Sequence, residues 1–501
     1  MTGPASRGGS RGSSLDRFLR LFTDVRPGEA NTALLLALNV FILLTAYSAL
    51  KVLREPLILD VPGGAALKSY SSAGQAIVLV FLVPLYGLIA RRVPRRTLIN
   101  VVTAFFVGCL LLFFALYRLK VFIGVPFYIW QGVFNLMIIA QFWSFTNDLY
   151  TTDEGKRLFP IVMLGASVGA VVGSTITAVL IRPLGLSPLF FVAAGLLVLA
   201  AVITNIVDVR ERRRTEGVVP EFMQSGQIPA ATPQVRTATG EFKVPGEAHL
   251  AASGTLRAIS REDLERARST PAAPPPLRPT GAFALVFTNR YLLLIALLML
   301  LLNCVNAIGE YVLDNTLTAL APGIAAREGT TSELIIAAYK GGYQATVNIV
   351  ALLLQLFVVA RVIKYLGVRV ALLVMPVIAF AGYGVMAFVP ILMAIRWAKT
   401  AENATDYSLQ NTIRQALFLP TTREEKYAAK QAIDGFFMRM GDVSAAVLVY
   451  FGTHYYLSLG SLRFEMGTRH FALLNMAFIA MWLAVAVAIG RRYERLVAAT
   501  P

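Results

Sequence analysis

The chain has 501 residues, of which 56% are hydrophobic and only 15% are charged. Soluble domains carry about 25% charged residues, so this composition excludes an ordinary soluble protein and indicates a membrane protein. The net charge of +17 does not indicate nucleic-acid binding, because the basic residues lie mostly in loops between apolar segments. Those segments are too long, and too poor in charge, for a membrane β-barrel.

Apolar runs of about 20 residues are typical of transmembrane helices. Twelve such runs predict an all-α integral membrane protein, and they cover residues 30–50, 67–90, 97–117, 123–147, 157–181, 188–208, 289–313, 334–360, 368–389, 391–414, 428–452 and 469–490. The chain then divides into a basic tail, a six-helix half, a linker, a second six-helix half and a short tail, at residues 1–29, 30–208, 209–288, 289–490 and 491–501.

Clusters of basic residues follow the second, sixth, eighth and twelfth predicted helices. All of these loops fall on one side of the membrane, and Lys and Arg are enriched in cytoplasmic loops. We therefore expect both termini to be cytoplasmic. The clusters comprise Arg91, Arg92, Arg95, Arg96, Arg210, Arg212, Arg213, Arg214, Arg361, Lys364, Arg369, Arg491 and Arg492.

The first predicted helix ends in polar residues. Lys51, Arg54 and Glu55 lie near its C-terminal end, and Pro56 is expected to stop it. Two interpretations are open here. The charged side chains either extend to the membrane surface from the helix end, or form a basic pair at the mouth of a cavity.

The fourth and fifth predicted helices differ in character. Gln131 and Asn135 place amides on the fourth helix, whereas Gly165, Gly169 and Gly173 repeat at four-residue spacing on the fifth. Small residues at this spacing allow another helix to approach closely. We interpret the glycines as a packing face and the amides as candidate cavity residues.

The segment 209–281 is rich in proline, alanine and arginine and contains no apolar run long enough to span a membrane. It predicts a largely disordered cytoplasmic linker between the two halves. A passive tether is the simpler interpretation, and a regulatory role is the alternative.

The seventh predicted helix repeats the polar pattern of the first. Asn303, Asn306, Glu310 and Asp314 fall on one face, and Lys340 lies on the next helix. An ionisable residue inside an apolar run is a candidate functional site. A structural ion pair with a basic residue on another helix is the alternative for Glu310.

The tenth predicted helix carries the strongest polar stripe of the chain. Lys399, Glu402, Asp406, Gln410 and Arg414 recur every three or four residues, which places all five on one helical face. Charged groups facing lipid would cost several kcal/mol each. This face must therefore contact protein or a water-filled cavity.

The two halves also resemble each other in sequence. Residues 47–55 align with 306–314, which sets Lys51 opposite Glu310, and residues 151–157 align with 421–427. Two repeats of six helices joined by a long loop predict a major-facilitator-like architecture with a substrate site between the halves. On the eleventh helix, Arg439 and Asp442 are spaced to pair with each other.

No pattern in the chain indicates an enzyme or a bound cofactor. The three histidines have no metal-ligand or catalytic spacing, and no phosphate-binding GxxxxGK[ST] loop is present. The expected partners are the lipid bilayer and a small anionic substrate, and the sequence does not predict the oligomeric state.

Four stretches, at residues 47–55, 142–174, 306–317 and 406–434, resemble in the same order those of the nucleotide transporters called the ATP/ADP translocase family. The resemblance implies nucleotide exchange, ATP for ADP, in a protein of the bacterial inner membrane. By position, the family's functional lysine, glutamate and lysine correspond to Arg54, Glu310 and Arg414. A family glutamate falls on Gln131.

Two further positions differ in charge from the family pattern. Lysines of the family fall on Asp314 and Asp406, so two basic positions have become acidic. A nucleotide phosphate needs several Lys or Arg donors, for which the candidates are Lys51, Arg54, Lys340, Arg396, Lys399 and Arg414. These two charge differences leave open that the substrate is another nucleotide or a less charged anion.

Three functions therefore compete at this point. The first is a nucleotide antiporter, and the second is a proton- or ion-coupled transporter of another organic anion in which Glu310 or Asp406 carries the proton. The third is a membrane protein that does not transport and instead acts in assembly or sensing. The candidate substrate-binding residues are Lys51, Arg54, Gln131, Asn135, Glu310, Lys340, Lys399, Asp406 and Arg414.

Overall fold

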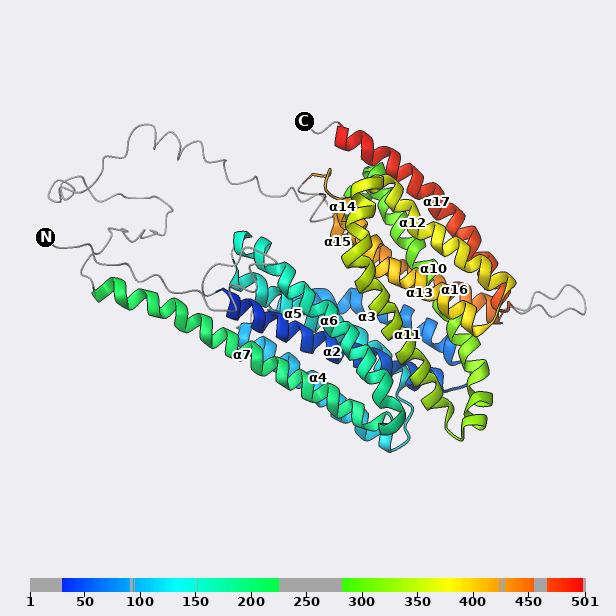
Figure 1. Ribbon diagram of the computed structural model, residues 1–501, viewed down its shortest axis with the longest axis horizontal. Helices are drawn as coiled ribbons and strands as arrows, with labels where there is room; N and C mark the ends of the chain where they lie inside the picture. The colour runs from blue at the N-terminus through cyan, green and yellow to red at the C-terminus, as the bar shows by residue number, and fades with distance from the viewer. Residues whose placement is uncertain are drawn as a thin grey trace, which may run out of the picture. The chain divides into compact units, whose positions relative to one another are not determined.

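The computed structural model describes residues 29–90, 93, 95–150, 152–224, 282–422, 425, 429–454 and 466–498, and their regular structure is entirely helical (Figure 1). The chain divides into two units, Met1–Val209 with Gly281–Pro501, and Arg210–Thr280. The first unit contains all twelve predicted membrane segments. The predicted N-terminal tail up to residue 28 and the linker residues 225–281 lie outside the described residues.

Six helices of the N-terminal half coincide with the first six predicted segments. They are α2 (Ala30–Leu59), α3 (Gly64–Ala90), α4 (Arg95–Arg118), α5 (Gly124–Leu149), α6 (Thr152–Leu184) and α7 (Ser187–Gln224). The helix α7 thus extends into the segment that we assigned to the linker.

The prediction that Pro56 ends the first helix is wrong. The helix α2 continues through Pro56 to Leu59, and the backbone N–H of Asp60 bonds to the Pro56 carbonyl oxygen at 3.1 Å. Proline removes only its own N–H from the helical ladder, so a helix can continue past it at a local cost. The extra turn carries Glu55 into the interior of the bundle, where it is 4% exposed.

The C-terminal half contains the other six predicted segments in more broken form. Its elements are α9 (Ala282–Thr288), α10 (Arg290–Glu328), α11 (Ser332–Leu354), η2 (Gln355–Val359), α12 (Ala360–Phe388), α13 (Leu392–Thr405), η3 (Asp406–Gln410), α14 (Asn411–Ala416), α15 (Lys430–Ala432), η5 (Ile433–Phe437), α16 (Met438–His454) and α17 (Thr468–Ala498). The three η segments are π-helical turns, which occur frequently at functional sites.

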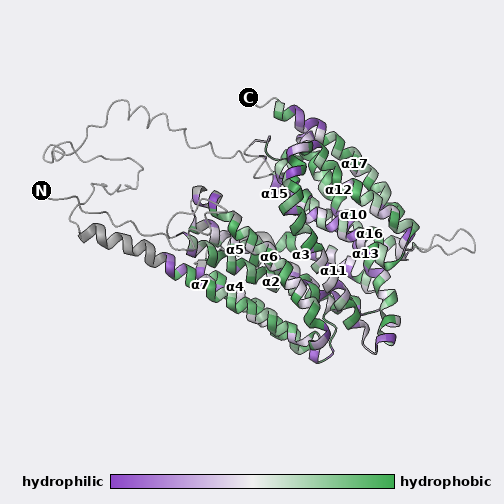
Figure 2. Ribbon diagram, viewed as in Figure 1, coloured by the Kyte–Doolittle hydropathy of each residue, from purple (hydrophilic) through white to green (hydrophobic). Residues whose placement is uncertain are grey.

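Nine helical stretches among the described residues are long and apolar enough to cross a membrane. One of them, Ser332–Phe388, covers the eighth predicted segment and nearly all of the ninth, although the backbone departs from helical geometry at Gly367 (φ 72°). The tenth and eleventh segments are not among the nine, since charge and π-helical turns interrupt them. Hydrophobic residues cover most of each helix, with hydrophilic ones mainly near helix ends (Figure 2).

The predicted glycine face on α6 is confirmed. A methyl group added at Gly165, Gly169 or Gly173 would overlap with a backbone carbonyl oxygen of α2, at Ala37, Phe41 or Thr45 respectively. The two backbones therefore touch along three turns, as small residues at four-residue spacing allow. This contact fixes the position of α2, which carries the first half of the candidate site.

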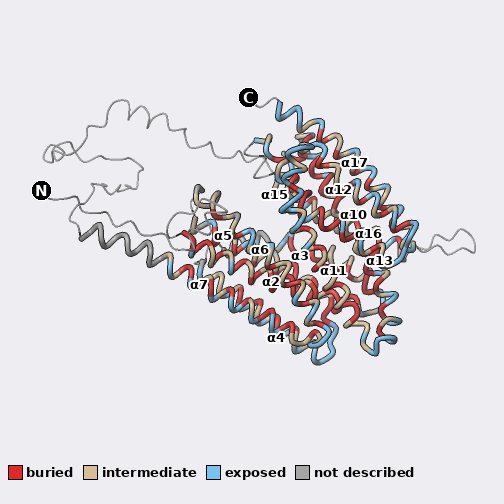
Figure 3. The backbone as a smooth tube through the Cα atoms, viewed as in Figure 1, coloured by how far each residue is buried: buried red, intermediate tan, exposed pale blue. Residues whose placement is uncertain are grey.

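Two large hydrophobic clusters form the core, one mainly in the N-terminal half around α2 and α5 and one mainly in the C-terminal half around α10. The second also includes residues of the N-terminal half, such as Ile58 and Tyr128. Buried faces lie where helices of the bundle meet, and exposed faces lie on outer helices such as α17 (Figure 3). Between the halves, α11 packs on α6 and α2, while α3 packs on α16 and α10. The Asn348 amide on α11 donates to the Ala170 carbonyl at 3.0 Å and to Ser174 Oγ at 3.1 Å on α6.

Candidate functional site

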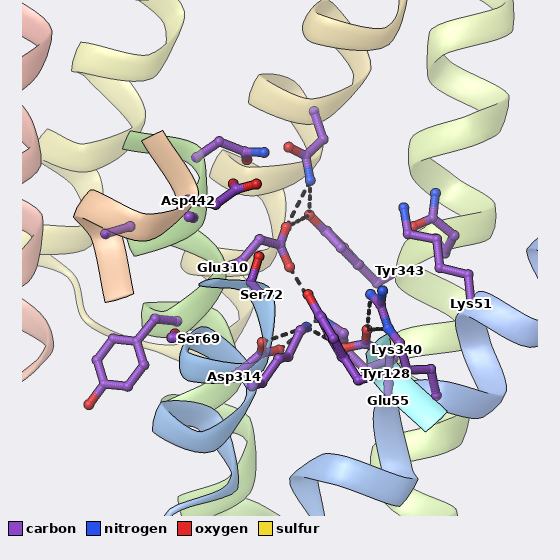
Figure 4. A pocket seen from close by; sticks show the side chains of 18 of the residues that line it. Lys51, Glu55, Ser69, Ser72, Tyr128, Glu310, Asp314, Lys340, Tyr343 and Asp442 are labelled. Carbon is purple, nitrogen blue, oxygen red and sulfur yellow. Dashed lines mark hydrogen bonds and ion pairs between the residues drawn. The ribbon is translucent and has the colours of Figure 1, made fainter. Parts of the chain in front are cut away.

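A cavity of about 180 Å³ lies between the two halves, near the end of α2 and the start of α3. Helices from both halves supply its lining: α2, α3 and α5 on one side, and α10, α11, α13, η3 and α16 on the other. The charged lining residues are four cations and four carboxylates, namely Lys51, Arg54, Lys68 and Lys340, and Glu55, Glu310, Asp314 and Asp442. Figure 4 shows most of these side chains converging.

Four of these charged side chains form a closed set of ion pairs, which we call the ionic ring: Glu55, Lys68, Asp314 and Lys340. Lys68 Nζ lies 2.5 Å from Glu55 and 2.7 Å from Asp314. Lys340 Nζ lies 3.2 Å from Glu55 and 2.7 Å from Asp314. Each carboxylate thus contacts both lysines, and two of the four pairs connect the N-terminal to the C-terminal half.

The ionic ring follows the internal repeat of the sequence. The alignment of residues 47–55 with 306–314 places Glu55 opposite Asp314, and each ends the polar segment of the first helix of its half. The lysines lie in the early turns of the following helices, α3 and α11. All four residues are buried, with exposed fractions between 1% and 7%.

Two more charged residues extend the ring into the cavity. Arg54 contacts Glu55 at 2.7 Å, donates to Gln131 at 2.9 Å and lies 4.2 Å from the Tyr128 ring centre. Glu310 contacts Lys340 at 3.3 Å. It also accepts hydrogen bonds from Tyr343 and Asn403, at 3.1 and 2.9 Å (Figure 4). In this part of the cavity, the cations are therefore already neutralised by carboxylates.

Lys51 differs from the other cavity cations. Its ammonium group contacts the Tyr407 hydroxyl at 3.1 Å and lies 5.4 Å from the Tyr407 ring centre. Among the residues that the structure describes, no carboxylate lies within ion-pair distance of Lys51. Lys51 is therefore the cavity cation that is free to bind an anion without first losing an ion pair.

Exposure changes along the cavity in one direction. Tyr407, beside Lys51, is 42% exposed, whereas Asp314 in the ionic ring is 1% exposed. Lys51 precedes Glu55 by one turn of α2, so the more exposed end lies toward the N-terminus of that helix. The ionic ring thus forms a buried part of the cavity lining, and Tyr407, beside Lys51, is its more exposed part.

A second buried ion pair lies behind the cavity wall, within the C-terminal half. Lys399 and Glu402 are 2.9 Å apart, with side chains that are 0% and 2% exposed. Lys399 also donates to Asn306 Oδ1 at 2.7 Å, and Asn306 itself lines the cavity. Asn403, which follows Glu402 in the chain, lines the cavity and donates a hydrogen bond to Glu310.

The nine site residues that were predicted from the sequence fall into three groups by their position relative to the cavity. Lys51, Arg54, Glu310 and Lys340 line the cavity, and Gln131 contacts it through Arg54. Lys399 lies behind the wall and Asp406 follows it in the π-helical turn η3. Asn135 and Arg414 do not line the cavity, and Arg414 instead donates to Asn411 at 2.9 Å.

Several cavity residues are absent from that predicted set: Glu55, Lys68, Asp314, Tyr128, Asn403 and Tyr407. A usable signal existed for Asp314, which shares a helical face with Glu310, and for Glu55, which aligns with Asp314 in the repeat. Lys68 stands at the start of a helix, where a solvated lysine is common. The expected pairing of Arg439 with Asp442 is confirmed, at 3.4 Å.

The described residues contain no group of three or more His, Cys, Asp or Glu side chains that could hold a metal ion. The two cysteines, Cys109 and Cys304, are not paired with each other.

Residues 32–405 match the Major Facilitator Superfamily. The chain belongs to the major facilitator superfamily. Its fold agrees with solved transporters of this type. The nucleoside transporter NupG has a TM-score of 0.56 at 13% identity, with 92% of this chain and 98% of that chain covered. A POT-family peptide transporter has a TM-score of 0.55 at 14% identity, covering 93% and 97%.

Two curated relatives from Chlamydia pneumoniae are also similar. "ADP,ATP carrier protein 1" is 20% identical over 390 residues, covering 72% of this chain and 65% of the carrier. "ADP,ATP carrier protein 2" is 22% identical over 259 residues, covering 47% and 45%. The chain thus matches just under two thirds of the first carrier and less than half of the second. Membership of the major facilitator superfamily makes the chain a multi-pass membrane transporter rather than an enzyme.

Proposed function

We propose that this transporter exchanges nucleotides, ATP for ADP or a related pair, by alternating access of the cavity between its two halves. The observation that carries the proposal is Lys51, a cavity cation that has no carboxylate partner among the described residues. Together with Arg54 one turn away, it offers donors of the kind that bind phosphate. The similarity to the two ADP,ATP carriers supports the same substrate class.

The aromatic residues around these cations suit a nucleotide. Tyr128 lies against the Arg54 guanidinium and Tyr407 lies beside Lys51, so both rings border the cation pair. A base could stack on either ring while the phosphates contact the cations. We assign substrate contact to Lys51 and Arg54, with Glu310 and Lys340 forming the adjoining wall.

The proposed location is a bacterial inner membrane, with both termini in the cytoplasm. The basic loops on the terminus side support this orientation through the positive-inside rule. The more open end of the cavity would then face the cytoplasm.

The test is transport by purified protein in liposomes. Liposomes preloaded with ADP are given labelled ATP, and uptake is compared with that into liposomes without ADP. Exchange predicts uptake only with internal ADP. A folded preparation that takes up no ATP, ADP or AMP under either condition would contradict the proposal.

One observation favours a second candidate, an ion-coupled transporter of another organic anion. The pair of Lys399 and Glu402 is buried away from the cavity, and Lys399 donates a hydrogen bond to Asn306, which lines the cavity. Buried ionisable chains of this kind occur in proton relays. Uptake that is driven by an imposed pH gradient, without internal substrate, would support this candidate over exchange.

A further inference from the structure

One part of the cavity lining takes no part in the contacts assigned to Lys51 and Arg54. It lies where α16 packs on α3, and it includes Asp442 on α16 and Ser72 on α3. Figure 4 shows Asp442 and Ser72 at one side of the cavity and Lys51 at the other. A substrate that is held by its anionic group at Lys51 would therefore meet Asp442 with a different part of its structure.

Asp442 keeps a free hydrogen-bond acceptor although it has an ion-pair partner. Its Oδ2 atom lies 3.4 Å from Arg439 Nη1, which is longer than the 2.7 Å between Asp314 and Lys68. The Oδ1 atom makes no hydrogen bond to any residue that the structure describes, and it is not a buried atom. The carboxylate can therefore accept a hydrogen bond from a substrate in the cavity that it lines.

Asn306, on α10, supplies a donor whose orientation is fixed from behind the cavity wall. Its Oδ1 atom accepts a hydrogen bond from Lys399 at 2.7 Å. An ammonium group can only donate, so the amide oxygen must face Lys399 and the amide nitrogen is left for another partner. Within the described part of the chain, Nδ2 makes no hydrogen bond and is not buried. The Lys399 contact thus makes Asn306 a donor in the cavity wall.

Ser72 adds a hydroxyl group that can donate or accept. It lines the cavity, and its Oγ atom makes no hydrogen bond to a described residue. Ser69, one turn earlier on α3, donates to the Ala65 carbonyl oxygen at 3.3 Å and retains lone pairs that can accept. This side of the cavity therefore combines a charged acceptor, a donor and hydroxyl groups.

This combination of donor and acceptor fits hydroxyl groups better than it fits an ion. An ammonium group would satisfy Asp442 but could accept nothing from Asn306, and an anionic group would be repelled by Asp442. A hydroxyl group both donates and accepts. Two adjacent hydroxyl groups can contact Asp442 and Asn306 together, and carboxylates bind the ribose hydroxyl in dinucleotide-binding proteins.

The covalent structure of a nucleotide brings such a diol to this side of the cavity. The base and the 5′-phosphate chain flank the ring oxygen of the ribose, whereas the 2′- and 3′-hydroxyl groups lie on the opposite edge of the ring. With the phosphates at Lys51 and the base at Tyr407, the diol edge points away from both. Beside Asp442, Ala445 and Ala446 leave room for a sugar ring and offer no aromatic face on which a base could stack.

We propose that Asp442, Asn306 and Ser72 form a subsite that binds the ribose diol of the substrate, and that this subsite makes the transporter selective for ribonucleotides over deoxyribonucleotides. The inference rests on the proposed function, because it takes the substrate to be a nucleotide. Since Ser72 belongs to the N-terminal half and the other two residues to the C-terminal half, the sugar would contact both halves.

The first measurement uses the unaltered full-length protein. Liposomes preloaded with ADP take up labelled ADP, while unlabelled ADP or its 2′-deoxy or 3′-deoxy form competes. Loss of a hydrogen bond to a carboxylate should raise the inhibition constant of at least one deoxy form about tenfold. Equal inhibition by all three compounds would overturn the subsite.

The second measurement removes the carboxylate. Asp442→Ala should bind ADP about tenfold more weakly and bind the deoxy forms as the parent protein does, so that the discrimination disappears. Asp434→Ala is the matched control, because Asp434 lies on the π-helical turn before α16 and does not line the cavity. It should keep the parent ratio, whereas an unchanged ratio in Asp442→Ala would refute the assignment.

Two more variants separate contact with the sugar from other effects. Arg439→Gln removes the partner of Asp442 and leaves its carboxylate, so it should keep the discrimination. A loss as large as in Asp442→Ala would attribute the effect to the ion pair and overturn the subsite. Ser72→Ala should reduce the discrimination in part, and together with the parent measurement it decides the question if Asp442→Ala does not fold.

Inosine diphosphate as a competitor tests whether the subsite contacts the base instead. If Asp442→Ala changes the preference for ADP over inosine diphosphate and leaves the deoxy ratio unchanged, the ribose assignment is wrong. The proposed function fails in a different way. A parent protein that neither takes up ADP nor is inhibited by any nucleotide refutes the function, whereas ADP uptake that both deoxy forms inhibit as well as ADP refutes only the subsite.

Discussion

Lys51 is the residue on which the proposed substrate contact depends most directly. Its ammonium group contacts only the Tyr407 hydroxyl and ring among the described residues, so a phosphate can approach without breaking an ion pair. Lys51→Gln should raise KM for the transported nucleotide about tenfold or more, the value of a charge-assisted hydrogen bond. Initial rates of exchange in liposomes measure this change.

A matched control exists elsewhere in the chain. Lys364 lies 5.5 Å from the Tyr365 ring centre, a similar lysine–tyrosine contact away from the cavity. Lys364→Gln should leave KM unchanged, and Lys51→Arg should keep most of the affinity. An unaltered KM in Lys51→Gln would exclude Lys51 from the substrate site.

The buried pair of Lys399 and Glu402 gives a prediction about stability. Lys399→Met leaves the Glu402 carboxylate buried and unpaired, which should destabilise the protein by about 3–5 kcal/mol. The double variant Lys399→Met/Glu402→Gln removes both charges and should recover most of that loss. Thermal unfolding of the four proteins in detergent measures the coupling.

Recovery in the double variant distinguishes a charge effect from a packing effect. If the double variant is no more stable than Lys399→Met, the loss comes from the shape of the lysine side chain rather than from the stranded carboxylate. Uptake driven by a pH gradient, measured on the double variant, also tests the ion-coupled candidate, because that candidate uses an ionisable group at this position.

At the scale of elements, the contact between α2 and α6 should be the part of the fold most sensitive to added volume. Gly169→Ala places a methyl group against the Phe41 carbonyl oxygen, which belongs to a rigid helix backbone. Overpacking of this kind costs about 1–3 kcal/mol. We expect a lower unfolding temperature and lower transport, since α2 carries Lys51 and Glu55.

Gly195 on α7 provides the matched control for this substitution. A methyl group there meets no atom within 4 Å. Gly195→Ala should therefore be neutral or slightly stabilising, because alanine favours helix more than glycine does. An equal fall in unfolding temperature in both variants would show that the loss of a glycine, rather than the close approach of α2 and α6, determines the effect.

Sequence periodicity predicted which segments are helical better than it predicted what the polar side chains of those helices contact. The all-α, major-facilitator-like fold and the glycine face of α6 are confirmed, since both follow from local patterns of apolar and small residues. The five residues of the stripe from Lys399 to Arg414 are buried or half-buried, but periodicity could not distinguish a water-filled cavity from buried protein as their surroundings. Lys399 proved to be completely buried.

The ionic ring could not be derived in the same way. Lys68 and Asp314 lie in different halves of the chain, so no spacing rule connects them. The first helix was also wrongly predicted to end at Pro56. Because a residue at a helix terminus is normally solvated, Glu55 was not predicted to be buried. The internal repeat aligns Glu55 with Asp314 in the sequence. Only the structure shows that both carboxylates contact the same two lysines.

At the scale of the whole molecule, the direction from which the cavity is reached can be tested without knowing the substrate. The rise in exposure from the ionic ring to Tyr407 predicts access from the side of the chain termini. In a background with Cys109→Ser and Cys304→Ala, Tyr407→Cys should react with a membrane-impermeant maleimide applied from that side only. Right-side-out and inverted vesicles give the two directions.

Two exposed positions calibrate this measurement. Glu494→Cys, on the last helix before the C-terminus, marks the terminus side, and Leu119→Cys marks the opposite side. Tyr407→Cys should follow the labelling of Glu494→Cys. Reaction only from the side that labels Leu119→Cys would mean that the ionic ring does not close the cavity. If Tyr407→Cys reacts from the terminus side only, and from both sides once Glu55→Gln and Asp314→Asn are added, the ionic ring is the barrier.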